Sequence, residues 1–202
     1  ERKLEVITSW THVVHLRYRT RDLFEIVFRV KETGEDLVLI AGHWPSRVAG
    51  KYRTEPLRIA VAEHIAYLVE EHVKVHPLHY EQLRGAADLA RVQEQWHTKV
   101  MVVGDFNDEP YDRSVVDHLR AGRDLERVTG RTNDITSFEK DTSKYRAQEV
   151  YLFNATAKFL QDGAVGTFFI SSLESGEAVP NRYQVLDQIV VSRGLLGTTG
   201  LR

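Results

Sequence analysis

The segment from Gly104 to Asp108 places a carboxylate and an amide directly after the apolar run 99–103. Hydrolysis of a phosphoester needs a base that activates water and donors that stabilise the charge developing on phosphorus. Asp105 is suited to the first role and Asn107 to orienting the water or the phosphate, and their i, i+2 spacing points both side chains to one side of an extended turn. The other interpretation is that Asp105 and Asn107 only build a tight turn, which both residue types do readily.

A second polar cluster follows the apolar run 37–41 and reads Gly42-His43-Trp44-Pro45-Ser46-Arg47. His43 can act as a general acid toward a leaving alkoxide. Ser46 offers a hydroxyl donor and Arg47 a fork-shaped guanidinium, so both are candidate substrate-binding residues for a phosphate. Taken alone, a histidine beside a tryptophan is more often a packed structural residue, and that interpretation stays open.

A third candidate is Asp187, which lies inside the apolar run 185–192. Such a carboxylate needs an ion pair or hydrogen bonds, because burying it unpaired is costly. A histidine partner would make Asp187 an orienting carboxylate, as in a catalytic triad. A structural cap, or an ion pair with Arg182 or Arg193, is equally consistent with the sequence.

The elements that must position these groups are strands interleaved with helices. The patterns predict strands at 4–8, 23–30, 37–41, 99–103, 166–171 and 184–192, and helices at 54–77, 80–94, 112–119 and 148–161. Thr54 is expected to cap the first helix, and Gly122 to end the third. Residues 123–148 are polar and irregular and are expected to form a surface loop. Together these elements indicate sheets covered by helices.

The composition narrows the classes of protein and partner. The chain has 202 residues, 42% of them hydrophobic, and a net charge of −2, which predicts one domain and no overall attraction to nucleic acid. Without cysteine, any metal must be held by oxygen or imidazole ligands. His72, His76 and His79 fall near a predicted helix end. A zinc or nickel site there is disfavoured relative to a solvated helix terminus, because no second pair of ligands accompanies them.

No apolar run approaches the roughly 20 residues that span a bilayer, so no transmembrane segment is expected. The chain begins at Glu1 rather than Met. A leader sequence would therefore not be visible, and the compartment, cytoplasmic or secreted, stays open.

The order and spacing of the three motifs, 43–47, 104–108 and 186–192, resemble the endonuclease/exonuclease/phosphatase superfamily. Its members include deoxyribonucleases, abasic-site endonucleases, inositol polyphosphate 5-phosphatases and neutral sphingomyelinases. The resemblance implies an α+β fold, a four-layer αββα sandwich in which two mixed sheets pack face to face between helices, with the site at one edge of the sheets. It also implies that residues 1–202 form a single domain that is incomplete at both ends.

The resemblance implies a metal-dependent phosphoesterase in which Asp105 activates the attacking water and Asn107 orients it or the phosphate. His43 resembles a general acid or phosphate contact, and Asp187 resembles a buried carboxylate that orients a later histidine. Asp105 and Asn107 are the candidate ligands of Mg or Mn. The expected substrate is a phosphate ester: a nucleic acid, an inositol phosphate, a lipid headgroup or a sugar phosphate.

Two motifs of the superfamily have no counterpart in the chain: the glutamate that is the principal magnesium ligand, and the Ser-Asp-His motif near the C-terminus. Residues that act as a unit lose most of their effect when some are missing, so weak or no turnover is expected from these 202 residues alone. The alternative function is that of an inactive family member or fragment that binds a phosphate-bearing ligand or a protein through the same edge.

Overall fold

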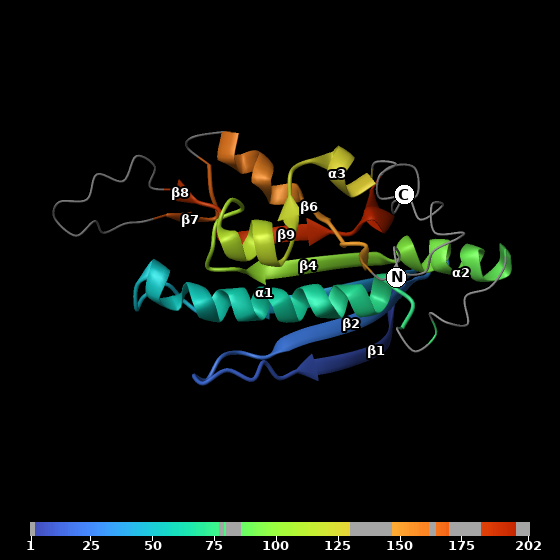
Figure 1. The fold of residues 1–202 in the computed structure, drawn as a ribbon, viewed down its shortest axis with the longest axis horizontal. Coiled ribbons are helices and arrows are strands. Elements are labelled where there is room, and N and C mark those ends of the chain that lie inside the picture. The colour runs from blue at the N-terminus through green and yellow to red at the C-terminus, as the bar shows by residue number, and fades with distance from the viewer. Residues whose placement is uncertain are drawn as a thin grey trace.

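Seven strands form one mixed sheet in the order β1-β2-β3-β4-β9-β6-β5 (Figure 1). This computed structural model describes residues 3–76, 79, 86–129, 147–161, 165–169 and 183–196. The strands of the sheet are β1 (Leu4–His12), β2 (Leu23–Val30), β3 (Asp36–His43), β4 (Lys99–Asp105), β5 (Ala121–Gly122), β6 (Leu152–Asn154) and β9 (Asp187–Val191). Two further strands, β7 (Phe168–Phe169) and β8 (Tyr183–Gln184), pair separately.

The helices are α1 (Lys51–Val73), α2 (Ala86–Trp96) and α3 (Leu125–Thr129), with a 3₁₀ helix at Ala155–Gln161 and short helical turns at Ser114–His118 and Arg193–Leu195. Strands β1, β2 and β3 are antiparallel neighbours, whereas β3 and β4 are parallel. A parallel pair needs a crossover between its strands, and the chain segment that carries α1 and α2 provides it. Among the described helices, none combines the length and apolarity needed to cross a bilayer.

Helix α1 runs along one face of the sheet (Figure 1). Beneath it lie Ile40, Val102 and Val190 from three adjacent strands, each at most 1% exposed. Val61 and Ile65 of α1 belong to the same buried cluster. We call this side the covered face.

The opposite face of the same strands is the open face. Side chains alternate between the two faces along a strand, and the pairing register places Val6, Phe24 and Ile189 together on this second side. They are 59%, 44% and 43% exposed. The predicted α+β class is confirmed, and the described residues form one large sheet and one small sheet of two strands.

Several predicted boundaries change. Helix α1 begins at Lys51, so the predicted Thr54 cap is wrong: the N-cap is Gly50, whose positive φ of 103° turns the chain into the helix. The Thr54 hydroxyl instead donates to the Gly50 carbonyl. The predicted helix 148–161 is wrong in its first half, because residues 152–154 form β6 between β5 and β9, whereas Ala155–Gln161 form a 3₁₀ helix.

Other predictions are met in part. The strand predicted at 23–30 is β2, and the strand predicted at 184–192 is divided into β8 and β9 by residues 185 and 186. The helix predicted at 112–119 is reduced to a turn at Ser114–His118, and the chain runs on to place Gly122 in β5. Residues 80–85, 130–146 and 170–171, which belong to other predicted elements, lie outside the described residues.

Candidate active site

His43, Asp105 and Asp187 lie side by side on adjacent strands. His43 and Asp105 are register partners at the carboxyl ends of the parallel strands β3 and β4, and Asp105 pairs in turn with Asp187 at the start of β9. His43 Nε2 is 3.5 Å from Asp105 Oδ2, and the two side chains are 45% and 31% exposed. The register places all three on the open face, where solvent or a substrate can reach them.

Two glycines allow the strand ends to approach. Gly104 has a φ of 146°, and a Cβ built there would lie 1.8 Å from the carbonyl oxygen of Gly42. A Cβ at Gly42 would lie 2.6 Å from Leu23 Cδ2. A side chain at position 104 would therefore separate the two strands that carry His43 and Asp105.

The turn after β4 is built by the candidate residues themselves. Asp105 Oδ1 accepts the backbone N–H of Asn107 at 2.8 Å. Asn107 has a φ of 50°, in the left-handed region that asparagine tolerates, and its side-chain Nδ2 donates to the Trp44 carbonyl at 2.9 Å. Asp105 thus uses one carboxylate oxygen for the turn and directs the other toward His43, so the two interpretations of this motif are compatible.

Aromatic packing joins the loop after β3 to the loop after β4. The rings of Trp44 and Phe106 stack with centroids 4.3 Å apart and planes 6° apart, and both residues are fully buried. The backbone N–H of Trp44 donates to the Asp105 carbonyl at 2.9 Å, and the backbone N–H of Phe106 donates to the Leu186 carbonyl at 2.8 Å. Hydrogen bonds and stacking therefore fix the backbone on both sides of Asp105.

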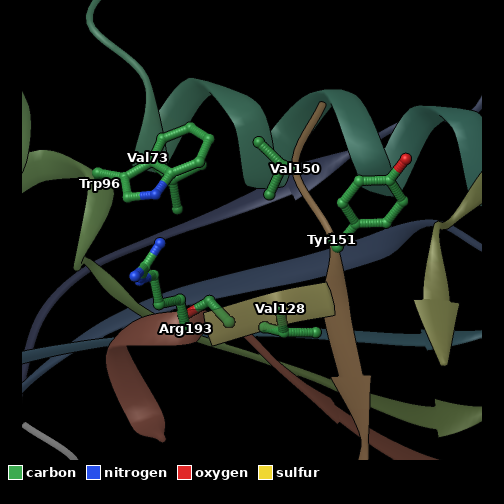
Figure 2. Close-up of a pocket in the computed structure, with 7 residues that line it drawn as sticks. Val73, Trp96, Val128, Val150, Tyr151 and Arg193 are labelled. Atoms are coloured by element: carbon green, nitrogen blue, oxygen red, sulfur yellow. The ribbon is translucent and has the colours of Figure 1, made fainter. Parts of the chain in front are cut away.

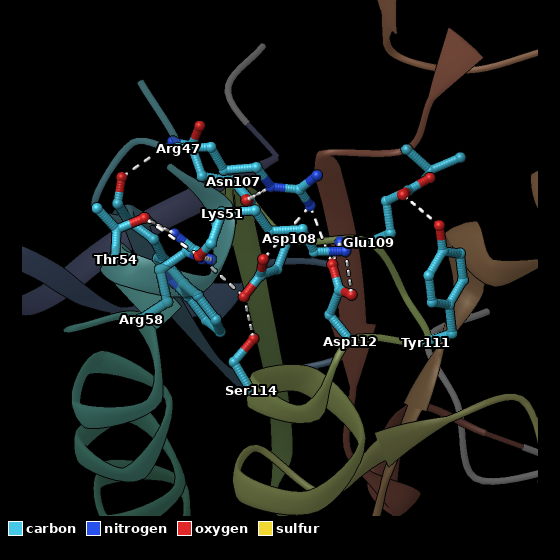
Figure 3. A network of polar contacts seen from close by, with 12 residues as sticks. Arg47, Lys51, Thr54, Arg58, Asn107, Asp108, Glu109, Tyr111, Asp112 and Ser114 are labelled. Atoms are coloured by element: carbon cyan, nitrogen blue, oxygen red, sulfur yellow. Dashed lines mark hydrogen bonds and ion pairs between the residues drawn. The ribbon is translucent and has the colours of Figure 1, made fainter. Parts of the chain in front are cut away.

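A buried ionic network holds the loop from the covered side (Figure 3). The guanidinium of Arg58, which is fully buried in α1, lies 2.7 Å from Asp108 Oδ2, and the Ser114 hydroxyl donates to the same oxygen at 2.5 Å. Burial raises the pKa of the Asp108 carboxyl, while Arg58 and Ser114 oppose that rise. Because an unpaired charge buried here would destabilise the folded chain, the loss of either Arg58 or Asp108 would leave the other in an unfavourable position.

Arg47 joins this network. Its Nε donates to the Asn107 carbonyl, and its Nη2 lies 3.0 Å from Asp112 Oδ2 and 3.3 Å from Asp108 Oδ1. Lys51 Nζ donates to the other oxygen of Asp112 at 2.6 Å. The Arg47 side chain is only 16% exposed. The guanidinium expected to bind phosphate is therefore engaged by the loop.

The Ser46 side chain lies at an exposed position beside this loop. Its hydroxyl oxygen accepts the backbone N–H of Val48 at 3.2 Å. A hydroxyl that accepts one hydrogen bond still has its own proton to donate. Ser46 is therefore in a position to donate to a bound phosphate.

A second buried contact comes from β9 and β6. The Gln188 side chain donates to the Asp108 carbonyl at 2.6 Å, and the Asn154 side chain donates to Gln188 Oε1 at 2.6 Å. Both side chains are 1% exposed. The sequence interpretation overlooked Arg58, Gln188 and Asn154; for Arg58 the available signal was a charged residue on the apolar stripe of α1.

Asp187 occupies a different environment from the one expected. It is exposed, because it starts β9 on the open face, so the predicted burial is wrong. Its backbone N–H donates to Thr167 Oγ1 at 2.9 Å. Of the two predicted ion-pair partners, Arg193 donates to the Thr129 carbonyl, and Arg182 lies outside the described residues.

The donor groups at this edge match a hard cation in part. Asp105 and Asp187 present two carboxylates at register-partner positions, and Mg²⁺ in proteins is held by one or two carboxylates together with water and substrate oxygens. Within the described ranges, no group of three His, Cys, Asp or Glu side chains could hold a metal ion. His72 instead contacts Glu25 at 2.9 Å.

A small cavity of about 10 Å³ lies far from this edge (Figure 2). Its lining includes Val73 at the end of α1, Trp96 at the end of α2, and Arg193. Trp96 precedes β4 and Asp105 ends it, and that strand of seven residues spans about 23 Å. The cavity is therefore separate from the candidate site.

Comparisons with known proteins agree with the family resemblance. Residues 5–156 match the model of the Endonuclease/Exonuclease/phosphatase family. The chain belongs to this family. No curated protein matches the chain.

The chain is similar to three solved structures, among others. The chain is similar to truncated TDP2 of Caenorhabditis elegans (TM-score 0.53, 13% identity, covering 94% of this chain and 53% of that one). It is also similar to D. rerio TDP2 complexed with a single-strand DNA product, with a TM-score of 0.51 and 12% identity, covering 94% of this chain and 54% of that one. A third is the human Nocturnin catalytic domain with a bound sulfate anion, with a TM-score of 0.47 and 15% identity, covering 95% of this chain and 49% of that one. The chain therefore spans about half the length of the structures that it matches.

Proposed function

We propose that this chain carries the catalytic edge of a phosphoester hydrolase. The observation that supports this most directly is the meeting of His43 and Asp105 at the ends of two parallel strands, within a chain of this family. A water or hydroxyl that attacks phosphorus must lose a proton, and the leaving oxygen must gain one. A carboxylate and an imidazole on one exposed edge provide these two functions.

Asp105 is the proposed general base. The Asn107 N–H holds one carboxylate oxygen in place, so the carboxylate keeps a fixed orientation, and the second oxygen faces the open side. His43 protonates the leaving oxygen or donates a hydrogen bond to the phosphate. The 3.5 Å separation between His43 Nε2 and Asp105 Oδ2 keeps the two groups close enough to act on one substrate.

The supporting roles follow from the same contacts. Asn107 orients the water or the phosphate, and Ser46 donates its hydroxyl to the substrate. Asp187 supplies a second carboxylate beside Asp105. Arg47 acts through the loop, because its guanidinium contacts the Asn107 carbonyl and two aspartates.

The proposed cofactor is Mg or Mn, with Asp105 and the side-chain oxygen of Asn107 as ligands from this chain. The Asn107 Nδ2 donates to the Trp44 carbonyl, which leaves the amide oxygen as the atom suited to a cation. When bound, the ion would supply charge neutralisation at the phosphate. The proposed substrate class is a phosphate ester, whether nucleic acid, inositol phosphate, lipid headgroup or sugar phosphate.

The test uses the intact protein, bis-p-nitrophenyl phosphate, and either Mg or Mn. Loss of a general base lowers turnover by about 10²–10⁴-fold, and we expect Asp105→Ala to fall in or beyond that range. Asp117→Ala is the matched control, because Asp117 is an exposed aspartate in an exposed ion pair with Arg113. Equal rates for the wild type and Asp105→Ala would overturn the proposal.

A second candidate function is phosphate binding without turnover. It is favoured by the small number of metal-ligating groups at the described edge, where Asp105 and Asp187 are the two carboxylates. In that case the intact protein would bind inorganic pyrophosphate saturably, His43→Ala would weaken binding, and no metal-dependent hydrolysis would occur. Hydrolysis that depends on Asp105 would exclude this candidate.

A further inference from the structure

The loop between β1 and β2 carries three arginines in five residues, Arg17, Arg19 and Arg21. In the described part of the chain, none of the three side chains makes a hydrogen bond or an ion pair. Arg47 and Arg58, by contrast, are held by aspartates. Since the whole chain has a net charge of −2, the positive charge of this loop is a local feature.

Two of these arginines line a groove of about 430 Å³. Its lining comes from two segments of the chain: Tyr18, Arg19 and Arg21 from the β1–β2 loop, and Pro45, Ser46 and Leu57 from the stretch after β3. Arg17 does not line it. The groove thus gathers two guanidinium groups, which have no ion-pair partner among the described residues, with the segment that follows His43.

The groove adjoins the candidate site. Ser46 lies three residues after His43, and three residues of chain span at most about 11 Å. Successive phosphates of a nucleic acid strand advance about 3.4 Å along the duplex axis. A substrate with more than one phosphate could therefore reach both the His43–Asp105 edge and the groove.

We propose that this arginine groove binds a second phosphate of the substrate while the scissile phosphate lies at His43 and Asp105. The proposal rests on the proposed function and extends it to substrates that carry at least two phosphates. An arginine fork forms paired hydrogen bonds with phosphate oxygens, and the Ser46 hydroxyl, which also lines the groove, is one further donor. The second phosphate can belong to an oligonucleotide or to a small polyphosphorylated molecule.

The test compares two double variants of the intact protein. Arg19→Ala/Arg21→Ala removes the groove arginines. Arg17→Ala/Arg53→Ala removes the same charge from two exposed arginines that do not line the groove. Binding is measured by fluorescence anisotropy with a labelled six-nucleotide oligothymidylate, and by competition with myo-inositol hexakisphosphate. Hydrolysis of bis-p-nitrophenyl phosphate, which has a single phosphate, is measured in parallel.

We expect the groove variant to weaken binding by about tenfold or more and the control variant to change it by less than about threefold. Hydrolysis of the single-phosphate substrate should be unchanged in both. Competition by hexakisphosphate at lower concentration than unlabelled oligonucleotide would identify the small molecule as the source of the second phosphate, and the reverse order would identify nucleic acid.

Equal losses in the two double variants would overturn the proposal, because they would show a diffuse charge effect. Binding of neither probe by the wild type would overturn it as well. If the groove variant alone loses binding while bis-p-nitrophenyl phosphate is not hydrolysed by any form, the groove stands and the proposed hydrolase function fails.

Discussion

The two faces of the seven-stranded sheet differ in how far their side chains are buried. The covered face packs Ile40, Val102 and Val190 under α1, each at most 1% exposed. The open face carries apolar side chains such as Val6 and Phe24 that are roughly half exposed, and its edge presents His43, Asp105 and Asp187. The same strands therefore provide stability on one side and chemistry on the other.

The difference extends to the polar groups. On the covered side, Arg58 and Gln188 both contact Asp108, which lies one residue beyond Asn107. Their contacts hold the loop from behind. On the open side, His43 and Asp105 keep free access to solvent. Substitutions on the covered side should therefore lower the free energy of unfolding, and substitutions at the open edge should lower activity.

The largest expected effect is at the buried ion pair. Arg58→Met leaves the Asp108 carboxylate buried without its nearest cation, which should lower the free energy of unfolding by about 3–5 kcal/mol. Arg113→Met, at an exposed pair with Asp117, should change it by less than about 1 kcal/mol. Urea unfolding followed by circular dichroism measures both. Similar losses in the two variants would contradict the contrast between the two sides.

The second test makes one substitution on each face. Ile40→Ala removes methyl groups from the covered face and should cost about 2–5 kcal/mol. Ile189 is 43% exposed on the open face, so Ile189→Ala should cost less than about 1 kcal/mol. The same urea measurement applies. A cost at Ile189 as large as that at Ile40 would show that the open face is packed against something in solution.

The sequence identified the parts of the site that depend on local order along the chain. The motifs at 43–47, 104–108 and 186–192 each follow or begin a strand, and strands of alternating or apolar pattern are readable from sequence. The family resemblance implied a site at one edge of the sheets, whereas the register that pairs His43 with Asp105 and Asp105 with Asp187 comes from the structure. The resemblance also implied the α+β class.

Other features depend on contacts between distant residues. Arg58 and Asp108 are separated by fifty positions, and no local pattern pairs them. The sequence suggested Arg47 as a phosphate-binding residue, and in the structure its guanidinium donates to Asp112 and to the Asn107 carbonyl, both more than fifty positions away. The first half of the helix predicted at 148–161 gave way to β6, since pairing with β5 and β9 outweighed a moderate helical pattern. Asp187 is exposed because its strand begins at the open edge.

The third test concerns the exposed apolar side chains directly. Phe24→Lys and Val6→Lys each place a charge at an exposed position of the open face. Because little packing is lost, the free energy of unfolding should change by about 0.5–1 kcal/mol at most. The binding of the dye ANS to the 202-residue chain should decrease, since the exposed apolar area of this face becomes smaller. Unchanged dye binding, or unfolding of the variants, would show that this face is not open.

The smallest expected effect is a dependence on pH at the edge of the covered face. His64 of α1 has a lowered pKa, because burial disfavours its charged form and because His12 and His15 lie nearby. The unfolded chain then binds more protons than the folded chain just below the ordinary histidine pKa of about 6.5. The contribution of neutral His64 to stability is therefore complete above that pH and is lost as the pH falls through the lowered value.

His12 and His72, which both contact Glu25, remain in His64→Gln, so this variant isolates one histidine. Between pH 7.5 and 5.5 the free energy of unfolding should fall less steeply for His64→Gln than for the wild type, as measured by urea titrations at each pH. Parallel slopes would mean that the histidines around Glu25, rather than the burial of His64, set the response of this side of the sheet to acid.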